Sequence, residues 1–479
     1  MRLLTDTLVL NGIGTLQQQL YQLLQHCMLS GQWPHGAMLP SSRQLAQDLS
    51  LSRNTVNQVL AQLVTEGYLD AFAGRGYQVA ANFPDYFFQP AGIAATAVPA
   101  LTVHGYALPL KVVQPAGKLQ PGVPDLGGFP FGIWQRLLQR HASRKALAGF
   151  VDPLGYLPLR QALASYLRQS RQVLCSEQNI LITAGAQQGL MVAAKLTAKA
   201  GDQVLMESPG YPRLKQALQL CELQIAHVKA NGLHGLDVGS LPIDTAAKAL
   251  FLTPGHQYPL GGIMPLAQRL TLLEWARAQQ CWLIEDDYDS EYQYQQRPVA
   301  SLQGLAGGEG VIFVGSCSKT LFPALRLGYM VAPEPVIQQA AAIVQALHGD
   351  VAVLPQAVLA DFINEGHFNR HLRKMRRSYQ QKKHQACQLL QQYLPQCRLL
   401  ATDAGLHLVL CLPDNCDDQA LARQLQTQQL NVQPLSRYLF LQEASRGLVL
   451  GIADGTLSQQ QLALQQVADT VQRYLHVTL

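Results

Sequence analysis

The stretch GSCSKTLFPALRLGY, which begins at Gly315, brings together residue types that suit carbonyl and phosphate chemistry. Its lysine, Lys319, follows four apolar residues at 311–314, and these predict a buried strand that ends in a small-residue turn. A lysine at such a place is partly desolvated, so its amine loses a proton more readily and can form a Schiff base with a carbonyl. Groups that usually bind phosphate oxygens lie nearby at Ser316, Ser318 and Arg326. The alternative is an ordinary solvated lysine beside a buried strand.

A group of carboxylates follows another predicted strand, at residues 281–284. The segment EDDYDSEY, which begins at Glu285, concentrates acid at the end of this strand. Such carboxylates could ligate a divalent metal, lie in solvent, or place one negative charge against a pyridinium nitrogen. The third interpretation explains the neighbouring residues best, and no histidine or further carboxylate pattern supports a metal. We therefore predict no metal site.

Three more predicted strands end in residues that could contact a ligand. The strand at 179–183 runs into a glycine-bearing turn and a helix, whose free N–H groups suit a phosphate, at Gly185, Ala186 and Gln187. That motif is weak alone, because many such junctions bind nothing. The strand at 204–207 leads to Tyr211, which either stacks on an aromatic ligand or packs in a loop. The strand at 249–253 leads to His256 and Tyr258.

The order of these elements predicts the fold. Strands and helices alternate from about residue 179 to residue 330, which indicates an α/β fold with a mainly parallel sheet covered on both faces. Ligands bind at the strand ends of such sheets, where all the residues named above lie. The last hundred residues predict a small α/β domain with strands at 406–412 and 447–452. A basic helix expected at 366–384 is interpreted as a solvated face that packs on one side, rather than as a nucleic-acid site.

The first eighty residues predict three helices and a two-stranded turn. The second and third helices begin after serines that can cap them, and their spacing suits a helix-turn-helix whose second helix enters the major groove. The side chains placed to contact bases or phosphates are Ser41, Arg43, Ser52, Arg53, Asn54, Thr55, Asn57, Gln58 and, at the tip of the turn, Arg75. The alternative is a helical dimerisation cap with a solvated polar face, because four arginines are balanced by four carboxylates here.

These motifs resemble two known families. The segment from Leu39 to Ala80 resembles the winged helix of GntR-type repressors, although Asn57 stands where that family often has arginine. The stretch around Lys319 resembles the pyridoxal phosphate (PLP) attachment site of fold type I, class I and II aminotransferases. A winged helix joined to a complete aminotransferase-like unit resembles the MocR subgroup of GntR regulators, and this resemblance covers nearly the whole chain.

The aminotransferase resemblance implies roles for individual residues. Lys319 would carry PLP as a Schiff base, Asp286 would face the pyridinium nitrogen, and Tyr288 would hydrogen-bond the phenolic oxygen. The turn after residue 183 and the groups around Lys319 would bind one phosphate, and Tyr211 falls where the family stacks a ring on the pyridine.

The resemblance is not exact at two places, and it suggests one further residue. Tyr258 replaces the asparagine usual beside the phenolic oxygen, and His256 could serve instead. Phe150 stands where many members have a tyrosine that reaches the neighbouring subunit's phosphate. Arg437 is the candidate for the C-terminal arginine with which relatives bind a substrate carboxylate.

The whole chain fits a soluble, multidomain protein. Its 479 residues suggest a DNA-binding domain at 1–80, a linker at 81–120 and an aminotransferase-like domain at 121–479, whose small subdomain starts at about 370. The net charge of +5 is compatible with nucleic-acid binding but does not by itself indicate it. Nine cysteines with no CxxC pair favour reduced thiols, and the lack of an apolar signal core favours a cytoplasmic location.

The functional prediction is a homodimeric, DNA-binding transcription regulator that senses PLP, or an amino compound that forms an aldimine with it. The competing hypothesis is a working PLP-dependent aminotransferase with an accessory N-terminal domain, because all the catalytic parts are present. The identity of the effector, the operator sequence and the direction of regulation depend on pocket and surface shape, which sequence patterns do not reach.

Overall fold

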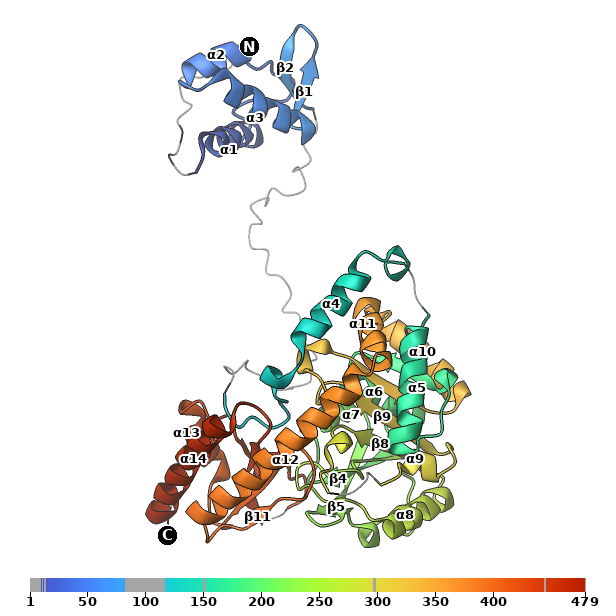
Figure 1. Cartoon of the computed structure of the whole chain (residues 1–479). Helices are drawn as coiled ribbons and strands as arrows, with labels where there is room; N and C mark the ends of the chain where they lie inside the picture. The colour runs from blue at the N-terminus through green and yellow to red at the C-terminus, as the bar shows by residue number, and fades with distance from the viewer. Residues whose placement is uncertain are drawn as a thin grey trace. The chain divides into compact units, whose positions relative to one another are not determined.

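The computed structural model describes residues 10, 12, 14–81, 117–149, 152–295, 299–442 and 445–478. The chain divides into two compact units on either side of the bond between Gly105 and Tyr106, and each is described by itself. Most of the expected linker, and Phe150, lie outside the described residues. Figure 1 labels the helices and strands of both units.

The N-terminal unit has three helices and one hairpin, at α1 (Leu16–Leu29), α2 (Ser42–Asp48), α3 (Arg53–Thr65), β1 (Leu69–Phe72) and β2 (Gly76–Val79). Serine side chains cap the second and third helices: the Ser41 hydroxyl accepts from the backbone N–H of Gln44, and the Ser52 hydroxyl from that of Thr55. Most leucines and valines of the three helices form one core with the buried Trp33. This arrangement confirms the predicted winged helix-turn-helix.

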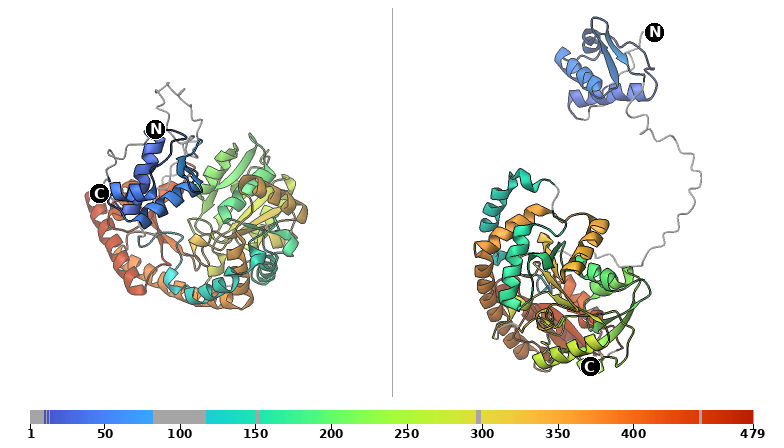
Figure 2. Two further views of the ribbon diagram at one scale, coloured as in Figure 1. Left: turned by 90° about the horizontal axis from the view of Figure 1, so that it is seen from above. Right: turned by 90° about the vertical axis from the view of Figure 1, so that its right-hand side faces the viewer.

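An eight-stranded sheet is the centre of the second unit (Figure 1 and Figure 2). The strand order is β3-β10-β9-β8-β7-β4-β5-β6. The five strands from β9 to β5 pair in parallel, whereas β10 is antiparallel to both of its neighbours and β6 is antiparallel to β5. The bounds are β3 (Ile180–Thr183), β4 (Gln203–Ser208), β5 (Gln224–Asn231), β6 (Gly235–Leu236), β7 (Ala249–Leu252), β8 (Trp282–Asp287), β9 (Val311–Ser316) and β10 (Gly328–Val331).

Helices cover both faces of this sheet because successive strand residues point to opposite sides. Leu181, for example, packs with α6, α7 and α10, whereas its neighbours Ile180 and Ile182 pack with α4, α5, α11 and α12. The helix α8 covers the second face farther along the sheet. The bounds are α4 (Phe131–Ala142), α5 (Leu157–Arg171), α6 (Ala186–Thr197), α7 (Pro212–Leu220), α8 (Leu266–Ala278), α9 (Leu302–Leu305), α10 (Glu334–His348), α11 (Val353–Asn364) and α12 (His367–Tyr393).

A second, antiparallel sheet forms a small C-terminal domain. Its strand order is β11-β12-β14-β13, with β11 (Leu399–Leu400), β12 (His407–Leu412), β13 (Gln433–Pro434) and β14 (Arg446–Gly451). The helices α13 (Asp418–Thr427) and α14 (Leu457–Thr478) and the end of α12 pack on it through one buried core. The predicted α/β class, with a large sheet domain and a small C-terminal α/β domain, is confirmed.

The basic helix α12 is only partly the solvated face that its charge pattern indicates. Lys382 and Lys383 are buried. The amine of Lys382 lies 2.8 Å from a carboxylate oxygen of Asp125 and donates to the carbonyl of Ala453, and the amine of Lys383 donates to the carbonyls of Ala404 and His407. Sequence patterning was wrong for these two lysines, which join α12 to loops far away in the chain.

All nine cysteines are free thiols in the structure. Among the described residues, no helix combines the length and the apolar composition that crossing a membrane requires.

Candidate functional site

The candidate site lies where the parallel strands of the large sheet end. The register of β8 and β9 places Asp286 opposite Val314 and Asp287 opposite Gly315, so the acidic segment and the turn before Lys319 are neighbours. Both strands are buried for nearly their whole length, which fixes the positions of the polar residues that follow them.

Lys319 is held by a backbone group that lies 197 residues earlier in the chain. Its Nζ donates a hydrogen bond of 2.6 Å to the carbonyl oxygen of Gly122. Gly122 has a φ of +79°, and a Cβ there would overlap the lysine amine. The site therefore includes a backbone group that the sequence patterns did not indicate, at the start of the aminotransferase-like domain expected at 121–479.

Asp286 is a buried carboxylate with one unsatisfied oxygen. It is 8% exposed, and its Oδ1 has no hydrogen-bond partner. Burial, followed by repulsion from Asp287 and Glu207, raises the pKa of Asp286 to about 7, while Lys319 opposes that rise. An unpartnered buried carboxylate near the lysine is what a cationic ring nitrogen requires, so this residue fits the pyridinium of PLP.

The neighbouring carboxylate, Asp287, has a different role. Its Oδ2 accepts a 2.8 Å hydrogen bond from Nε of the buried Arg171, which also binds the carbonyl of Val299. The two adjacent aspartates of the acidic segment are therefore not equivalent: one is paired within the protein and the other is not.

Groups suited to a phosphate converge at the start of α6. Gly185 precedes the helix with a φ of +93° and no side-chain cap, so the first N–H groups of α6 are not satisfied by a capping side chain. A Cβ at Gly185 would lie 3.6 Å from the guanidinium of Arg326, which donates to the Ala184 carbonyl at 2.9 Å. A helix N-terminus and a guanidinium together form an anion site.

The other predicted phosphate residues lie in the turn before Lys319 and in the first turn of α6. The Ser316 hydroxyl accepts a 3.1 Å hydrogen bond from the backbone N–H of Ser318, which tightens the turn before Lys319. Gln187, in the first turn of α6, donates to the Arg213 carbonyl, and its Oε1 is buried without a partner. Ala186 begins the helix.

Tyrosines and a histidine form the side of the site toward the small domain. The ring centroids of Tyr211 and Tyr258 are 6.2 Å apart, and the hydroxyl of Tyr258 lies 3.2 Å from that of Tyr438. The hydroxyl of Tyr288 lies 2.9 Å from Nδ1 of His256. Burial, with the charge of Asp289 as the next cause, raises the pKa of Tyr288 well above its usual range, so this phenol keeps its proton.

Arg437 is exposed in the short helical turn Leu435–Tyr438. Its Nη1 donates to Oε1 of Gln433 at 2.7 Å. The side chain therefore engages a polar neighbour in its own segment.

The candidate DNA-contacting residues surround the start of α3. Arg53, Asn54, Asn57 and Gln58 are exposed on this helix, and Thr55 is half-buried. The hydroxyl of Ser52 is within 2.8 Å of that of Thr55. Arg43 is exposed on α2, and Arg75 is exposed in the turn between β1 and β2. The serines at 41 and 52 act as caps, whereas the arginines and amides face solvent.

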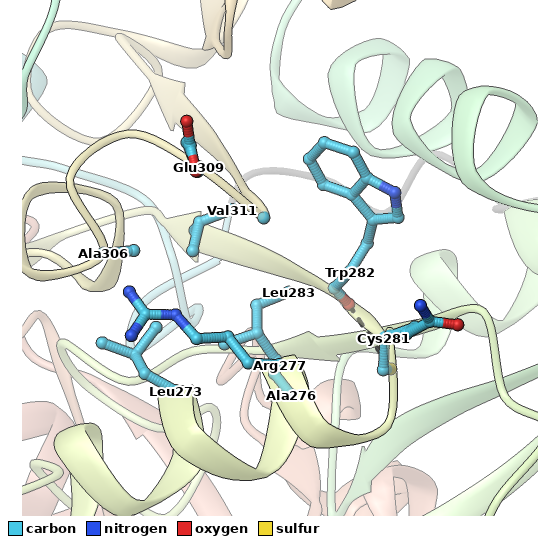
Figure 3. A pocket seen from close by; sticks show the side chains of 11 residues that line it. Leu273, Ala276, Arg277, Cys281, Trp282, Leu283, Ala306, Glu309 and Val311 are labelled. Carbon is cyan, nitrogen blue, oxygen red and sulfur yellow. Dashed lines mark hydrogen bonds between the residues drawn. The ribbon is translucent and has the colours of Figure 1, made fainter.

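The second unit also has a hollow and a group of possible metal ligands. The hollow has a volume of about 220 Å³ and lies between α8 and the first residues of β8 and β9. Leu273, Arg277, Trp282 and Val311 are among the residues that line it (Figure 3). It lies at the opposite ends of these strands from Lys319. Among the described residues, the group that could supply three metal ligands is His256, Asp289 and His407, whose ligand atoms lie within 4.8 Å of one another.

Comparisons with known proteins match both units. Residues 16–79 match the bacterial regulatory proteins of the gntR family, and residues 123–464 match aminotransferases of class I and II. The chain is 35% identical to the probable rhizopine catabolism regulatory protein MocR of Rhizobium meliloti, over 91% of this chain and 90% of that protein. It is 32% identical to the pyridoxine biosynthesis transcriptional regulator PdxR of Corynebacterium glutamicum, over 95% of each.

Solved aminotransferases share the fold of the second unit. The α-aminoadipate aminotransferase LysN of Thermus thermophilus, solved with a phosphopyridoxyl-leucine compound, superposes with a TM-score of 0.70 at 25% identity, covering 75% of this chain and 93% of LysN. Its fold is that of PLP-dependent enzymes, which implies PLP binding. The curated relatives named above are regulators, which favours regulation over turnover. The chain therefore belongs to the MocR-type transcriptional regulators, in which a gntR-family helix-turn-helix domain is joined to a class I and II aminotransferase domain.

Proposed function

We propose that this regulator binds PLP covalently at Lys319 and changes its affinity for operator DNA when PLP, or an amino compound that reacts with it, occupies the site. The observation that carries the proposal is the buried Asp286 oxygen without a partner, next to the end of the strand that leads to Lys319. Bound PLP supplies a carbonyl for the lysine and a cationic nitrogen for this carboxylate.

The remaining site residues would hold the cofactor from three sides. The phosphate would lie against the N-terminus of α6, and the ring would lie beside Tyr211. Its phenolic oxygen would face Tyr288. The full set is Gly185, Ala186, Gln187, Tyr211, His256, Tyr258, Asp286, Tyr288, Ser316, Ser318, Lys319 and Arg326. Arg437 is the candidate to bind a carboxylate of the effector, once it leaves Gln433.

Double-stranded operator DNA is the partner of the N-terminal unit. Exposed arginine and amide side chains at the start of α3 suit base edges in the major groove, and Arg43 and Arg75 suit phosphates. A homodimer is the proposed assembly, because a two-fold protein presents two recognition helices to a two-fold operator.

A gel-shift titration against DNA upstream of the protein's own gene tests the proposal, with and without PLP, at moderate salt and with competitor DNA. We expect a specific complex whose affinity changes with PLP. Lys319→Ala should lose the visible absorbance of covalently bound PLP and the PLP-dependent change in DNA affinity. Lys199→Ala, at an exposed lysine, is the matched control. An unchanged absorbance band in Lys319→Ala would overturn the site assignment.

The aminotransferase alternative rests on the complete set of Lys319, Asp286 and Arg326 at the strand ends. Sustained conversion of an amino acid and an oxo acid, combined with no specific complex on that DNA or on flanking promoters, would favour it.

A further inference from the structure

Two buried residues, His256 and Asp289, lie next to the hydroxyl of Tyr288. The proposed function counts His256 among the residues around PLP and gives Asp289 no role. His256 is 3% exposed and Asp289 is 1% exposed. Nδ1 of His256 lies 3.0 and 3.1 Å from the two carboxylate oxygens of Asp289, and 2.9 Å from the hydroxyl of Tyr288. One ring nitrogen is therefore within hydrogen-bond reach of an acceptor-only group and of a phenol.

The carboxylate decides where the imidazole proton lies. A carboxylate accepts hydrogen bonds and does not donate them, so Nδ1 of His256 carries a proton in both the neutral and the charged form of the ring. Nε2 lies 3.4 Å from the hydroxyl of Thr402, which can serve as donor or acceptor. The N–H at Nδ1 is thus shared between Asp289 and the phenolic oxygen of Tyr288.

A phenol that accepts from His256 has its own O–H free to donate elsewhere. We propose that His256 and Asp289 are positioning residues that make Tyr288 a hydrogen-bond donor toward the phenolic oxygen of PLP. This inference rests on the proposed binding of PLP at Lys319. It assigns to His256 a place behind Tyr288, rather than the direct contact with PLP that the sequence indicated.

The surroundings keep the imidazole in one orientation. A Cβ at Gly405 would overlap the ring of His256, and a Cβ at Gly261 would lie 3.3 Å from its Nε2, so two glycines make room for it. The ring of His407 lies 5.2 Å away, and Nε2 of His407 bonds the carbonyl of Pro259.

Several titratable groups face this network from other elements. Those that act on Tyr288 are Asp289, Tyr258, Asp286 and Glu207. Those that act on His407 are His256, Asp289 and, from α12, Lys383, which Asp289 also faces. Burial lowers the pKa of His407 to about 3, so this second histidine stays neutral. His407 therefore does not change the charge beside His256 in the ordinary pH range.

The pH titration of the visible absorbance of PLP bound to the full chain tests the inference. In bound PLP, the nitrogen joined to Lys319 would carry a proton near the phenolic oxygen. Tyr288 would donate to this oxygen, and its donation would matter most once that proton is lost, so removal of the Tyr288 hydroxyl would raise the pKa of the nitrogen. Tyr288→Phe should raise the midpoint by about one pH unit. His256→Leu should give a similar shift, because the N–H that makes Tyr288 an acceptor, and so leaves its O–H free to donate, is then lost.

Three comparisons separate positioning from a structural effect. His256→Asn keeps an N–H close to the position of Nδ1 and should restore most of the midpoint. His256→Leu should cause no further shift when Tyr288 is already phenylalanine. His141→Leu removes another buried histidine that is paired with an aspartate, at 2.9 Å from Asp361, and should leave the midpoint unchanged.

The outcomes distinguish this inference from the proposed function. If the wild-type chain forms no visible band with PLP, the proposed function fails and this inference fails with it. If the band forms and His256→Leu titrates like the wild type, or shifts equally in the Tyr288→Phe chain, only the positioning role is overturned. One firmly bound metal per chain that is lost with His256 would also overturn it, because a metal-bound Nδ1 carries no proton.

Discussion

Replacing Asp286 with asparagine should weaken PLP binding and at the same time stabilise the PLP-free protein. The carboxylate is buried, its Oδ1 has no partner, and its pKa is raised to about 7 from an ordinary value of 3.8. Such a difference in pKa between the folded and the unfolded state lowers the free energy of unfolding at high pH by at most about 4 kcal/mol. Asparagine has nearly the same shape and carries no charge to desolvate.

The sign of the pH dependence follows from this raised pKa. The folded state binds the proton of the Asp286 carboxyl more tightly than the unfolded state does. The stability of the wild-type protein therefore falls as pH rises from about 4 to about 7, and the loss is complete above that range. Asp286→Asn should lack this contribution. The variant should therefore match the wild type near pH 4 and exceed it by about 2 to 4 kcal/mol at pH 8.

PLP binding should change in the opposite direction. A charge-assisted hydrogen bond to the pyridinium contributes about 1.5–3 kcal/mol, so its loss should weaken PLP binding by about ten- to a hundredfold. The assays are urea unfolding of the PLP-free chain at several pH values and absorbance titration with PLP. A variant that is less stable than the wild type at pH 8, or that binds PLP equally well, would refute the reasoning.

The adjacent aspartate provides the contrast. Asp287→Asn breaks a buried ion pair and leaves the Arg171 guanidinium without its carboxylate, which should destabilise the protein by about 3–5 kcal/mol. The two substitutions change the same functional group at neighbouring positions, so opposite effects on stability would separate a ligand-binding carboxylate from a structural one.

Three further outcomes are expected. Gly122→Ala should cost about 1 kcal/mol in urea unfolding because of its positive φ, and should slow the appearance of the PLP band because the added methyl displaces the Lys319 amine; an unchanged rate would contradict the role of this contact. Ser52→Ala should lower the unfolding free energy of the N-terminal unit by about 1 kcal/mol through loss of the α3 cap, with Ser30→Ala, at a serine that does not cap a helix N-terminus, as the control. Arg53→Ala should weaken operator binding about tenfold or more in gel shifts without changing the PLP absorbance, and retained affinity would exclude a base or phosphate contact by Arg53.

The sequence predicted features that depend on local pattern. The strand before Lys319 was recognisable from four consecutive apolar residues, and the starts of α2 and α3 from serines that the structure shows as caps. The α/β class followed from the alternation of strands and helices. Because parallel strands end at one edge of a sheet, their terminal residues could be placed in one region without knowledge of the strand order.

Contacts between distant segments were not predictable in this way. Nothing in the Pro-Gly turn at 121–122 indicates that its carbonyl meets Lys319, and the two adjacent aspartates of β8 look alike until Arg171 is seen to pair with one of them. The buried lysines of α12 were missed for the same reason, since the carbonyls that satisfy them belong to loops near residues 404 and 453. Burial and pairing of this kind are set by tertiary packing, which residue spacing does not encode.

The contact between Gly122 and Lys319 also joins the site to residues 117–125, the first segment of the second unit that the structure describes. Residues 118 and 119 are fixed to the small domain by backbone hydrogen bonds with Gln429, Asn431 and Gly451, and Asp125 is fixed to α12 by Lys382. Between these anchors, the Gly122 carbonyl accepts from the lysine amine itself. A ligand that bonded to this amine would remove one hydrogen bond from the segment that directly follows residues 82–116, so the proposed occupancy of the site would alter how that segment is held.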